Sequence, residues 1–264
     1  MSRIRMSLYQ VLAVALVIGC GGANSPEAQA TPEPATPVQV AQAEAGAPSG
    51  GGSATITGSV TLSSAAPVQE KIKMDADPQC ALQHTEPVYK EEVVANANGT
   101  LRNVFVYVKQ GLEGKSFAAP AAPATFNQHG CRYEPHVLGV QVNQPVEIVN
   151  SDATLHNVNC KPTKSKPFNL AQPTKGMKSS KAFTAPEIMV KCVCNVHPWM
   201  AAYIGVVFHP YFSVTQDDGR FTLAGLPAGS YTIEAWQEKL GTQTQTVTVA
   251  DGESKNVTFE FKAQ

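Results

Sequence analysis

Short runs of β-favouring residues recur along the chain from residue 54 to its end, with turn-forming residues between them. Val, Ile, Thr and aromatic residues dominate the runs, and Gly, Pro, Asn and Asp separate them. Only the segments Gln69–Met74 and Pro78–His84 are compatible with a turn or two of helix. The pattern predicts an all-β protein built from β-sandwiches. The runs are ATITGSV, NVFVYVK, VLGVQVN, PVEIVN, EIMVKCV, YIGVVF, FTLAGL, SYTIEAW, QTQTVTVA and NVTFEF.

Residues 1–19 have the layout of an export signal. Arg3 and Arg5 precede the apolar run Val11–Ile18, and small residues follow it. The run is too short to span a bilayer, which needs about 20 apolar residues. The end of the run, VIGC at residues 17–20, resembles the lipobox of bacterial lipoproteins, which implies that Cys20 becomes the lipidated first residue of the mature protein. An ordinary cleaved signal and an uncleaved anchor are the alternatives.

Residues 20–53 are predicted to form a disordered tether. Ala, Pro, Gly, Gln and Glu dominate this segment, and such a composition buries too little apolar surface to offset the entropy of ordering. We therefore expect an exported protein that is lipid-anchored to a bacterial membrane and faces the periplasm or the cell surface, where disulfides persist. The formal net charge of -1 gives no indication of nucleic-acid binding.

The segment KCVCNVHPWM, residues 191–200, carries two cysteines, a histidine and a methionine within nine positions. Thiolate, imidazole and thioether groups are the soft and borderline ligands that proteins offer to transition metals. Two cysteines separated by one residue are also compatible with a redox pair or with halves of disulfides. The segment therefore indicates a metal site, disulfide chemistry, or both.

The order of features in residues 119–209 resembles the cupredoxin family, the Greek-key copper proteins that include plastocyanin and amicyanin. The region HVLGVQVNQPVEIVN is followed by SDATLHNV, a long polar loop and EIMVKCVCNVHPWMAAYIGVVF. The spacing C-x2-H-x2-M, with a proline after the histidine, is most similar to the ligand loop of amicyanin. The resemblance implies a Greek-key sandwich that binds one type 1 copper ion through His156, Cys194, His197 and Met200.

The resemblance also gives roles to two neighbouring residues. Asn157 matches the family's asparagine, which holds the ligand loop by hydrogen bonds around the sulfur. Pro198 has no N–H to donate to the Cys194 sulfur, and we expect its presence to lower the reduction potential. A zinc site is the alternative, although structural zinc is expected to take four thiolate or imidazole ligands rather than a thioether. The C-x-C spacing of Cys192 and Cys194 differs from the C-x3-C of two-copper CuA centres.

Four cysteines remain besides those expected to carry lipid and copper. In cupredoxins the strand with the first histidine lies antiparallel beside the strand that enters the cysteine loop. If His156 and Cys194 meet at the metal, this arrangement places Cys160 opposite Cys192. The resemblance thus implies a Cys160–Cys192 disulfide, with two free buried thiols as the alternative.

Cys80 and Cys131 are then left to form a second disulfide. It would join the segment MDADPQCALQH to the segment HGCRYEPH. Each cysteine also has a histidine nearby, His84 and His136, so a second metal site is the alternative. The spacings C-x3-H and C-x4-H match no familiar site, and they favour the disulfide.

The C-terminal pattern DDGRFTL-x-x-LPAGSYTIEAW resembles the carboxypeptidase regulatory-like, or transthyretin-like, sandwich of many secreted proteins. That module normally begins with strands like ITGSVTL and NVFVYVK, which occur here near Ile56 and Asn103, before the cupredoxin pattern. The resemblance implies one sandwich built from residues 54–118 and 210–264, with the cupredoxin domain inserted between its strands. Two consecutive domains are the alternative.

The polar segment KPTKSKPFNLAQPTKGMKSSK, between the first histidine and the ligand loop, contains six lysines and no acidic residue. Such a segment is usually a solvated loop. Because it begins near a predicted ligand, it is also suited to steer an acidic redox partner. Met177, Pro198 and Trp199 would add an apolar patch around the exposed edge of His197. The residues expected to dock the partner are Lys161, Lys164, Lys166, Lys175, Lys178 and Trp199.

These features predict a membrane-tethered blue copper protein that carries single electrons to a redox partner such as a cytochrome or an oxidoreductase. Four protein ligands leave no open coordination position, and the His-x-His pairs of the superfamily's multicopper enzymes do not occur in the sequence, so we expect no enzymatic activity. The alternatives are a copper carrier without a redox role and a carbohydrate-binding or scaffolding lipoprotein. The stacking residues for a sugar would be Tyr203, Tyr211, Tyr231 and Trp236.

Overall fold

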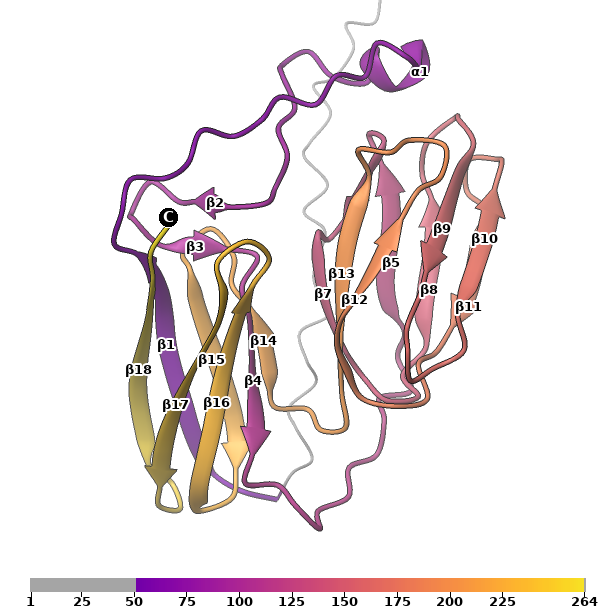
Figure 1. The fold of residues 1–264 in the computed structure, drawn as a ribbon. Coiled ribbons are helices and arrows are strands. Elements are labelled where there is room, and N and C mark those ends of the chain that lie inside the picture. The colour runs from indigo at the N-terminus through magenta and orange to yellow at the C-terminus, as the bar shows by residue number, and fades with distance from the viewer. Residues whose placement is uncertain (1–50, 264) are drawn as a thin grey trace, which may run out of the picture. The chain divides into compact units, whose positions relative to one another are not determined.

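The computed structural model describes residues 51–263, and nearly all of its regular structure is β (Figure 1). The only helix in this part of the chain is α1, Pro78–Ala81. The predicted all-β class is confirmed. Of the two segments compatible with helix, the second contains α1, whereas Gln69–Met74 contains no helix, because Lys71 forms an isolated bridge with Tyr89 instead.

The predicted signal segment 1–19, the lipidation site Cys20 and most of the predicted tether lie outside the described residues. Within residues 51–263, no helix combines the length and the apolar character needed to cross a bilayer.

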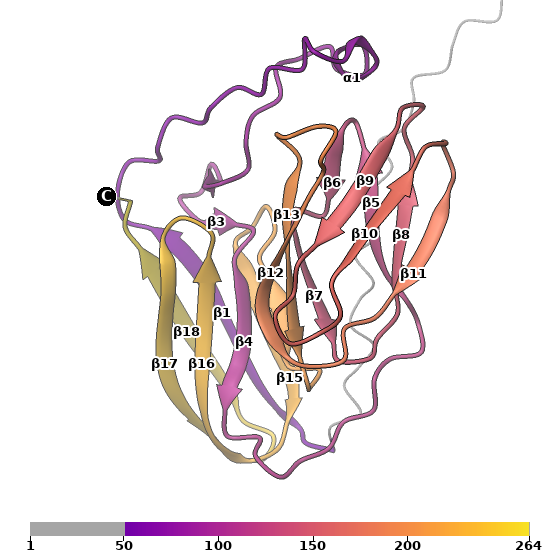
Figure 2. The ribbon, with the colours of Figure 1, turned by 45° about the vertical axis from the view of Figure 1, so that its right-hand side comes forward.

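Strands from both ends of the described chain share two sheets, which we call the terminal sandwich (Figures 1 and 2). β1 pairs antiparallel with β15 and parallel with β18, while β4 pairs antiparallel with β14 and β16. Every second residue of β1 from Ala54 to Val60 is buried, as the two-residue period of a strand requires. The strands are β1 (Ala54–Leu62), β4 (Phe105–Gln110), β14 (Phe212–Val214), β15 (Arg220–Leu226), β16 (Gly229–Gln237), β17 (Gly241–Val249) and β18 (Ser254–Phe261).

The middle of the chain forms a second pair of sheets, which we call the central sandwich. One sheet has the order β10-β9-β12-β13-β7 and the other the order β11-β8-β5-β6. Each contains one parallel pair, β13 with β7 and β5 with β8, so the chain crosses between the sheets rather than running up and down in one of them. The strands are β5 (Ala124–His129), β6 (Arg132–Glu134), β7 (Val137–Gln141), β8 (Val146–Asn150), β9 (His156–Cys160), β10 (Phe168–Gln172), β11 (Lys178–Lys181), β12 (Glu187–Val193) and β13 (Ala201–Val207).

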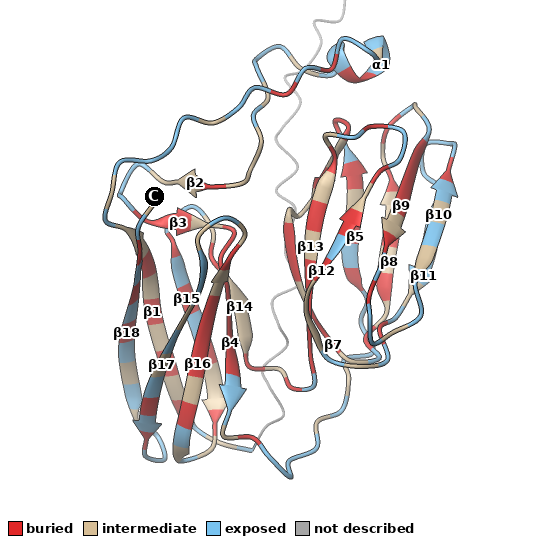
Figure 3. Cartoon of the chain, viewed as in Figure 1, coloured by how far each residue is buried: buried red, intermediate tan, exposed pale blue. Residues whose placement is uncertain are grey.

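The long polar loop expected after residue 160 contains two strands, β10 and β11, which corrects that expectation. β10 pairs with β9 and β11 pairs with β8, and each lies at the edge of its sheet. Their side chains alternate between half-buried and exposed positions, apart from the buried Gln172 at the end of β10, so little apolar sequence is needed (Figure 3). Polar and lysine-rich edge strands are common because they discourage edge-to-edge association.

Buried aromatic and aliphatic side chains join the two sandwiches. Phe105 and Tyr107 of β4 form one cluster with Val137 of β7 and Val207 of β13. Each sandwich also has its own hydrophobic core. The core of the terminal sandwich includes Ile56, and the central sandwich has a separate core. The division into 54–118 plus 210–264 and 119–209 stays a prediction.

Residues 75–84, which we call the cap segment, contain α1 and belong to neither sandwich. Asp77 begins α1 by accepting a hydrogen bond from the Gln79 backbone N–H at 2.9 Å. The cap segment is covalently attached to the central sandwich by a disulfide between Cys80 and Cys131. A short two-stranded sheet of β2 (Val94–Ala95) and β3 (Leu101–Arg102) follows it in the chain.

Candidate metal centre

The predicted ligands come from two places in the central sandwich. His156 is the first residue of β9, and the other three lie on the loop that joins β12 to β13. β9 and β12 are antiparallel neighbours, with Cys160 opposite Cys192 and Asn159 opposite Val193. This register brings the start of β9 next to the loop that leaves β12, so the strand pairing itself positions His156 beside the loop.

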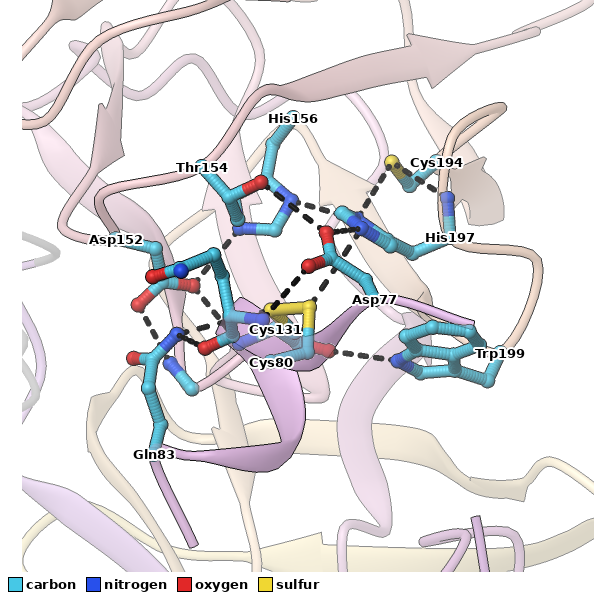
Figure 4. The surroundings of a disulfide bond; sticks show 12 residues. Asp77, Cys80, Gln83, Cys131, Asp152, Thr154, His156, Cys194, His197 and Trp199 are labelled. Carbon is cyan, nitrogen blue, oxygen red and sulfur yellow. Dashed lines mark hydrogen bonds and ion pairs between the residues drawn. A yellow bond between two sulfur atoms is a disulfide. The ribbon is translucent and has the colours of Figure 1, made fainter. Parts of the chain in front are cut away.

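The structure brings His156, Cys194 and His197 together (Figure 4). The two Nδ1 atoms are 2.9 Å apart, and the Cys194 Sγ lies 3.9 Å from the His197 Nδ1. The three side chains are almost completely buried, at 0%, 2% and 2% exposure. Met200 is also buried, and its backbone closes the loop by donating to the His197 carbonyl and accepting from the Cys194 N–H.

Each imidazole donates a hydrogen bond from its outer N–H group to a carboxylate. His156 Nε2 is 2.8 Å from Asp152 Oδ2, and His197 Nε2 is 2.9 Å from Asp77 Oδ2. Since an ionised carboxylate only accepts hydrogen bonds, both Nε2 atoms carry a proton, and each ring in its neutral form then has its lone pair on Nδ1. Asp77 and Asp152 were not predicted from the sequence, because a turn aspartate in MDADPQC or SDATLH carries no mark of its distant partner.

The ionisation of these groups follows from their contacts. Burial opposes the charge on Asp152, but hydrogen bonds from His156 and from the backbone N–H groups of Cys131 and Gly130 hold the pKa of this carboxyl below its usual range. Burial likewise opposes protonation of His156, yet Asp152 and the Cys194 sulfur raise the pKa of this imidazole to about 9. Burial raises the pKa of the Cys194 thiol, and contacts that include His156 and the His197 N–H outweigh this effect and lower it.

Asn157 holds the sulfur in place from the other side. Its side-chain oxygen accepts a hydrogen bond from the Asn195 N–H at 2.7 Å and lies 3.4 Å from the Cys194 sulfur. The His197 N–H donates to the same sulfur at 3.4 Å. Pro198, the next residue, is exposed and has no N–H to add a further donor.

The donor set fits a single transition-metal ion. Two Nδ1 lone pairs aimed at each other across 2.9 Å repel unless a proton or a cation lies between them. Metal–nitrogen bonds of about 2.0 Å and metal–sulfur bonds of about 2.3 Å are compatible with the observed separations. Thiolate with two imidazoles is a set that copper and zinc both accept. The assignment of these residues as metal ligands stays a prediction.

Both disulfides join the pairs expected from the sequence, Cys160 to Cys192 and Cys80 to Cys131. Cys194 is left as a free, buried thiol among the described residues. The alternative metal site with His84 and His136 is therefore not formed by these thiols. His84 instead contacts the Gly130 carbonyl at 2.8 Å, and His136 contacts Glu238 at 2.7 Å.

The expectation of an exposed His197 edge is wrong. The ring is 2% exposed, because Asp77 covers its outer nitrogen and the Cys80 sulfur lies 3.5 Å from that same atom. Trp199 packs against the ring at a centroid distance of 5.0 Å and donates its indole N–H to the Cys131 carbonyl at 3.0 Å. The five docking lysines are exposed, but Lys178 is already paired with Glu147 at 3.0 Å.

The aromatic residues considered for sugar stacking are mostly covered. Tyr211 and Tyr231 are each 1% exposed, so neither face is open to a ligand. Tyr203 and Trp236 are half-buried and pack on each other with ring centroids 5.1 Å apart.

Comparison with protein families gives one match. Residues 207–262 match the family model of the carboxypeptidase regulatory-like domain. They comprise the C-terminal strands of the terminal sandwich, from β14 to β18. No match was found among curated proteins.

Solved structures similar to this chain include a Cu-containing nitrite reductase, a purple cupredoxin and amicyanin. The Cu-containing nitrite reductase NirK from Thermus scotoductus SA-01 is 25% identical, over 37% of this chain and 25% of the reductase, with a TM-score of 0.31. A purple cupredoxin from Nitrosopumilus maritimus is 22% identical, over 31% of this chain and 98% of its own length, with a TM-score of 0.28. The reduced Cu(I) form of the P52G mutant of amicyanin is 23% identical, over 38% of this chain and 97% of its own length, with a TM-score of 0.29. This chain spans a quarter of the reductase.

Proposed function

We propose that the central sandwich binds one copper ion at His156, Cys194, His197 and Met200 and that the protein carries single electrons. The observation that supports this most is the convergence of two imidazole nitrogens and one free thiol sulfur in a buried cluster, with both outer nitrogens already held by carboxylates. A bound copper ion would supply a one-electron Cu(I)/Cu(II) couple.

The surrounding residues are suited to electron transfer rather than to catalysis. Two disulfides and the hydrogen bonds of Asn157 hold the donor atoms, so their arrangement would change little between redox states. Burial of all four side chains excludes water and leaves no open side for a substrate. We therefore propose that the protein is not an enzyme.

The place of action is part of the same proposal. The export signal and VIGC motif support a lipid-anchored protein that faces the periplasm or the cell surface, with the tether allowing the sandwiches to reach a partner. The partner would be a redox protein, such as a cytochrome or an oxidoreductase. Exposed lysines at 161, 164, 166 and 175 favour an acidic docking surface on it.

Copper titration of the chain from residue 54 to residue 264 tests the proposal. We expect one equivalent of Cu(II) to produce an intense visible thiolate-to-copper band. Cys194→Ser should abolish the band, because it removes the only free thiol in the described chain. The control is the Cys160→Ser/Cys192→Ser double variant, which loses two sulfurs but keeps Cys194 and should keep the band. A band that survives in Cys194→Ser would refute the ligand assignment.

A further inference from the structure

The ring of His197 is covered by a segment that is not part of the central sandwich. The cap segment places Asp77 Oδ2 at 2.9 Å and Cys80 Sγ at 3.5 Å from the His197 Nε2 (Figure 4). The Asp77 side chain is 22% exposed, whereas that of His197 is 2% exposed. Asp77 therefore separates the outer nitrogen of the ring from solvent.

The two carboxylate oxygens of Asp77 contact different groups. Oδ1 accepts the Gln79 N–H and so caps α1, whereas Oδ2 is turned toward His197. Thr154, two residues before His156, donates its hydroxyl to the same Oδ2 at 3.2 Å. Helix capping uses only one oxygen, so the orientation of the second is not explained by α1.

The cap segment is also tied to the other histidine. Cys131, the disulfide partner of Cys80, donates its backbone N–H to Asp152 Oδ2 at 2.8 Å, and this oxygen also contacts His156. The Cys80–Cys131 disulfide thus joins the segment that contacts His197 to the residue that holds Asp152 against His156. A displacement of the cap segment would affect both rings.

We propose that Asp77 is a positioning residue for His197: it holds the ring in the Nε2–H tautomer with Nδ1 toward the Cys194 sulfur, and it closes the ring off from water. The inference deepens the proposed function, on which it rests for the identity of the metal. It follows that electrons do not enter or leave over a bare His197 edge, and that a partner meets the cap segment there instead.

The test compares Asp77→Asn with Asp75→Asn in the chain from residue 54 to residue 264. Asparagine caps a helix as well as aspartate does, so Asp77→Asn keeps α1 but removes the charged acceptor. Asp75 is exposed on the same segment and undergoes the same change of charge, which makes it the matched control.

The first readout is isotope-edited NMR of the histidine ring nitrogens in the copper-free protein. In the parent and in Asp75→Asn we expect His197 as the Nε2–H tautomer, with a slowly exchanging ring proton. In Asp77→Asn we expect mixed tautomers and fast exchange of that proton with water. A purely structural role in capping α1 would leave the tautomer unchanged, because asparagine still caps.

The second readout is copper affinity, measured by competition with a chelator. Loss of a hydrogen-bond partner of a metal-binding histidine typically weakens binding about 10–100-fold, and we expect this loss in Asp77→Asn only. If Asp77→Asn and Asp75→Asn agree in both tautomer and affinity, the inference is overturned. If the parent gives no thiolate-to-copper band but Asp77→Asn still changes the tautomer, the copper proposal fails and the positioning role stands.

A second variant covers the case in which Asp77→Asn does not fold, as judged by circular dichroism. Thr154→Val removes the hydroxyl that orients Oδ2 and leaves the carboxylate in place. We expect faster exchange of the His197 ring proton than in the parent. Unchanged exchange in Thr154→Val would contradict the role of this oxygen.

Discussion

Buried polar contacts determine which nitrogen of each histidine faces its neighbours. In His156 and His197, a carboxylate holds Nε2 and leaves Nδ1 toward the sulfur. Turning over the His156 ring would leave Asp152 as a fully buried carboxylate without its partner, and breaking a buried pair of this kind typically costs about 3–5 kcal/mol. The orientation of the His156 ring is therefore determined in the copper-free protein and does not depend on a metal.

His209 is a buried histidine whose pKa is lowered rather than raised, and it gives a pH prediction. It donates Nε2–H to the Val108 carbonyl at 2.7 Å and accepts the Tyr211 N–H on Nδ1 at 3.2 Å. Burial lowers the pKa of His209 from 6.5 to about 4. Between these values the unfolded chain binds the proton and the folded chain does not. The stability that this residue contributes is therefore complete above about pH 6.5 and falls by about 3 kcal/mol as the pH drops to about 4.

Chemical denaturation of His209→Gln across this pH range checks the prediction. The variant lacks the titrating group, so its unfolding free energy should decline less between pH 6.5 and 4 than that of the parent. His129→Gln is the control, because the side chain of His129 is 60% exposed. Parallel pH profiles for the parent and His209→Gln would contradict the assignment.

At the scale of elements, the cap segment depends on its disulfide more than on its own structure. α1 has only four residues, and isolated helices of this length are not stable in water. Closing the sequence separation of 51 residues between Cys80 and Cys131 stabilises the folded state by about 4 kcal/mol in the chain-entropy model. We expect the Cys80→Ser/Cys131→Ser variant to lose stability of this order in urea titrations, and its His197 ring to become accessible to solvent. An unchanged unfolding free energy would show that the other contacts of the segment suffice.

The elements also show what the sequence could and could not predict. Runs such as VEIVN were predicted because alternate burial needs apolar residues at every second position, and β8 buries Val146 and Ile148 in this way. β10 and β11 were missed because edge strands can be held by backbone hydrogen bonds to a neighbouring strand, without an apolar pattern in their own side chains.

The candidate site was likewise predicted only in part from the sequence. The spacing of the ligand loop indicated Cys194, His197 and Met200, and the pairing of β9 with β12 brings His156 beside the first two. The covering of His197 could not be predicted, because it depends on where a segment more than 100 positions earlier comes to lie. A local motif carries no information on such a contact.

At the scale of the whole molecule, the two sandwiches are joined by packing and by a buried carboxylate. Glu238, after β16, accepts hydrogen bonds from His136 at 2.7 Å and from the Tyr203 hydroxyl at 2.9 Å. Burial opposes its charge, but His136 and Tyr203 hold the pKa of this carboxyl below its usual range. Nearby, Gly139 of β7 and Gly205 of β13 lie opposite each other in the parallel register. Together they form a notch that receives the rings of Phe105 and Phe212 from the terminal sandwich.

From the close packing in this notch we predict how the contact between the two sandwiches responds to one added methyl group. A Cβ at Gly139 would lie 2.5 Å from the Phe212 ring and 2.8 Å from the Phe105 ring, closer than van der Waals contact allows. We expect Gly139→Ala to lower the unfolding free energy by about 1–3 kcal/mol, the usual cost of overpacking. Phe212→Leu should relieve the clash, so the double variant should be less destabilised than the sum of the two single variants in a double-mutant cycle. Strict additivity would mean that the ring of Phe212 does not occupy the notch in solution.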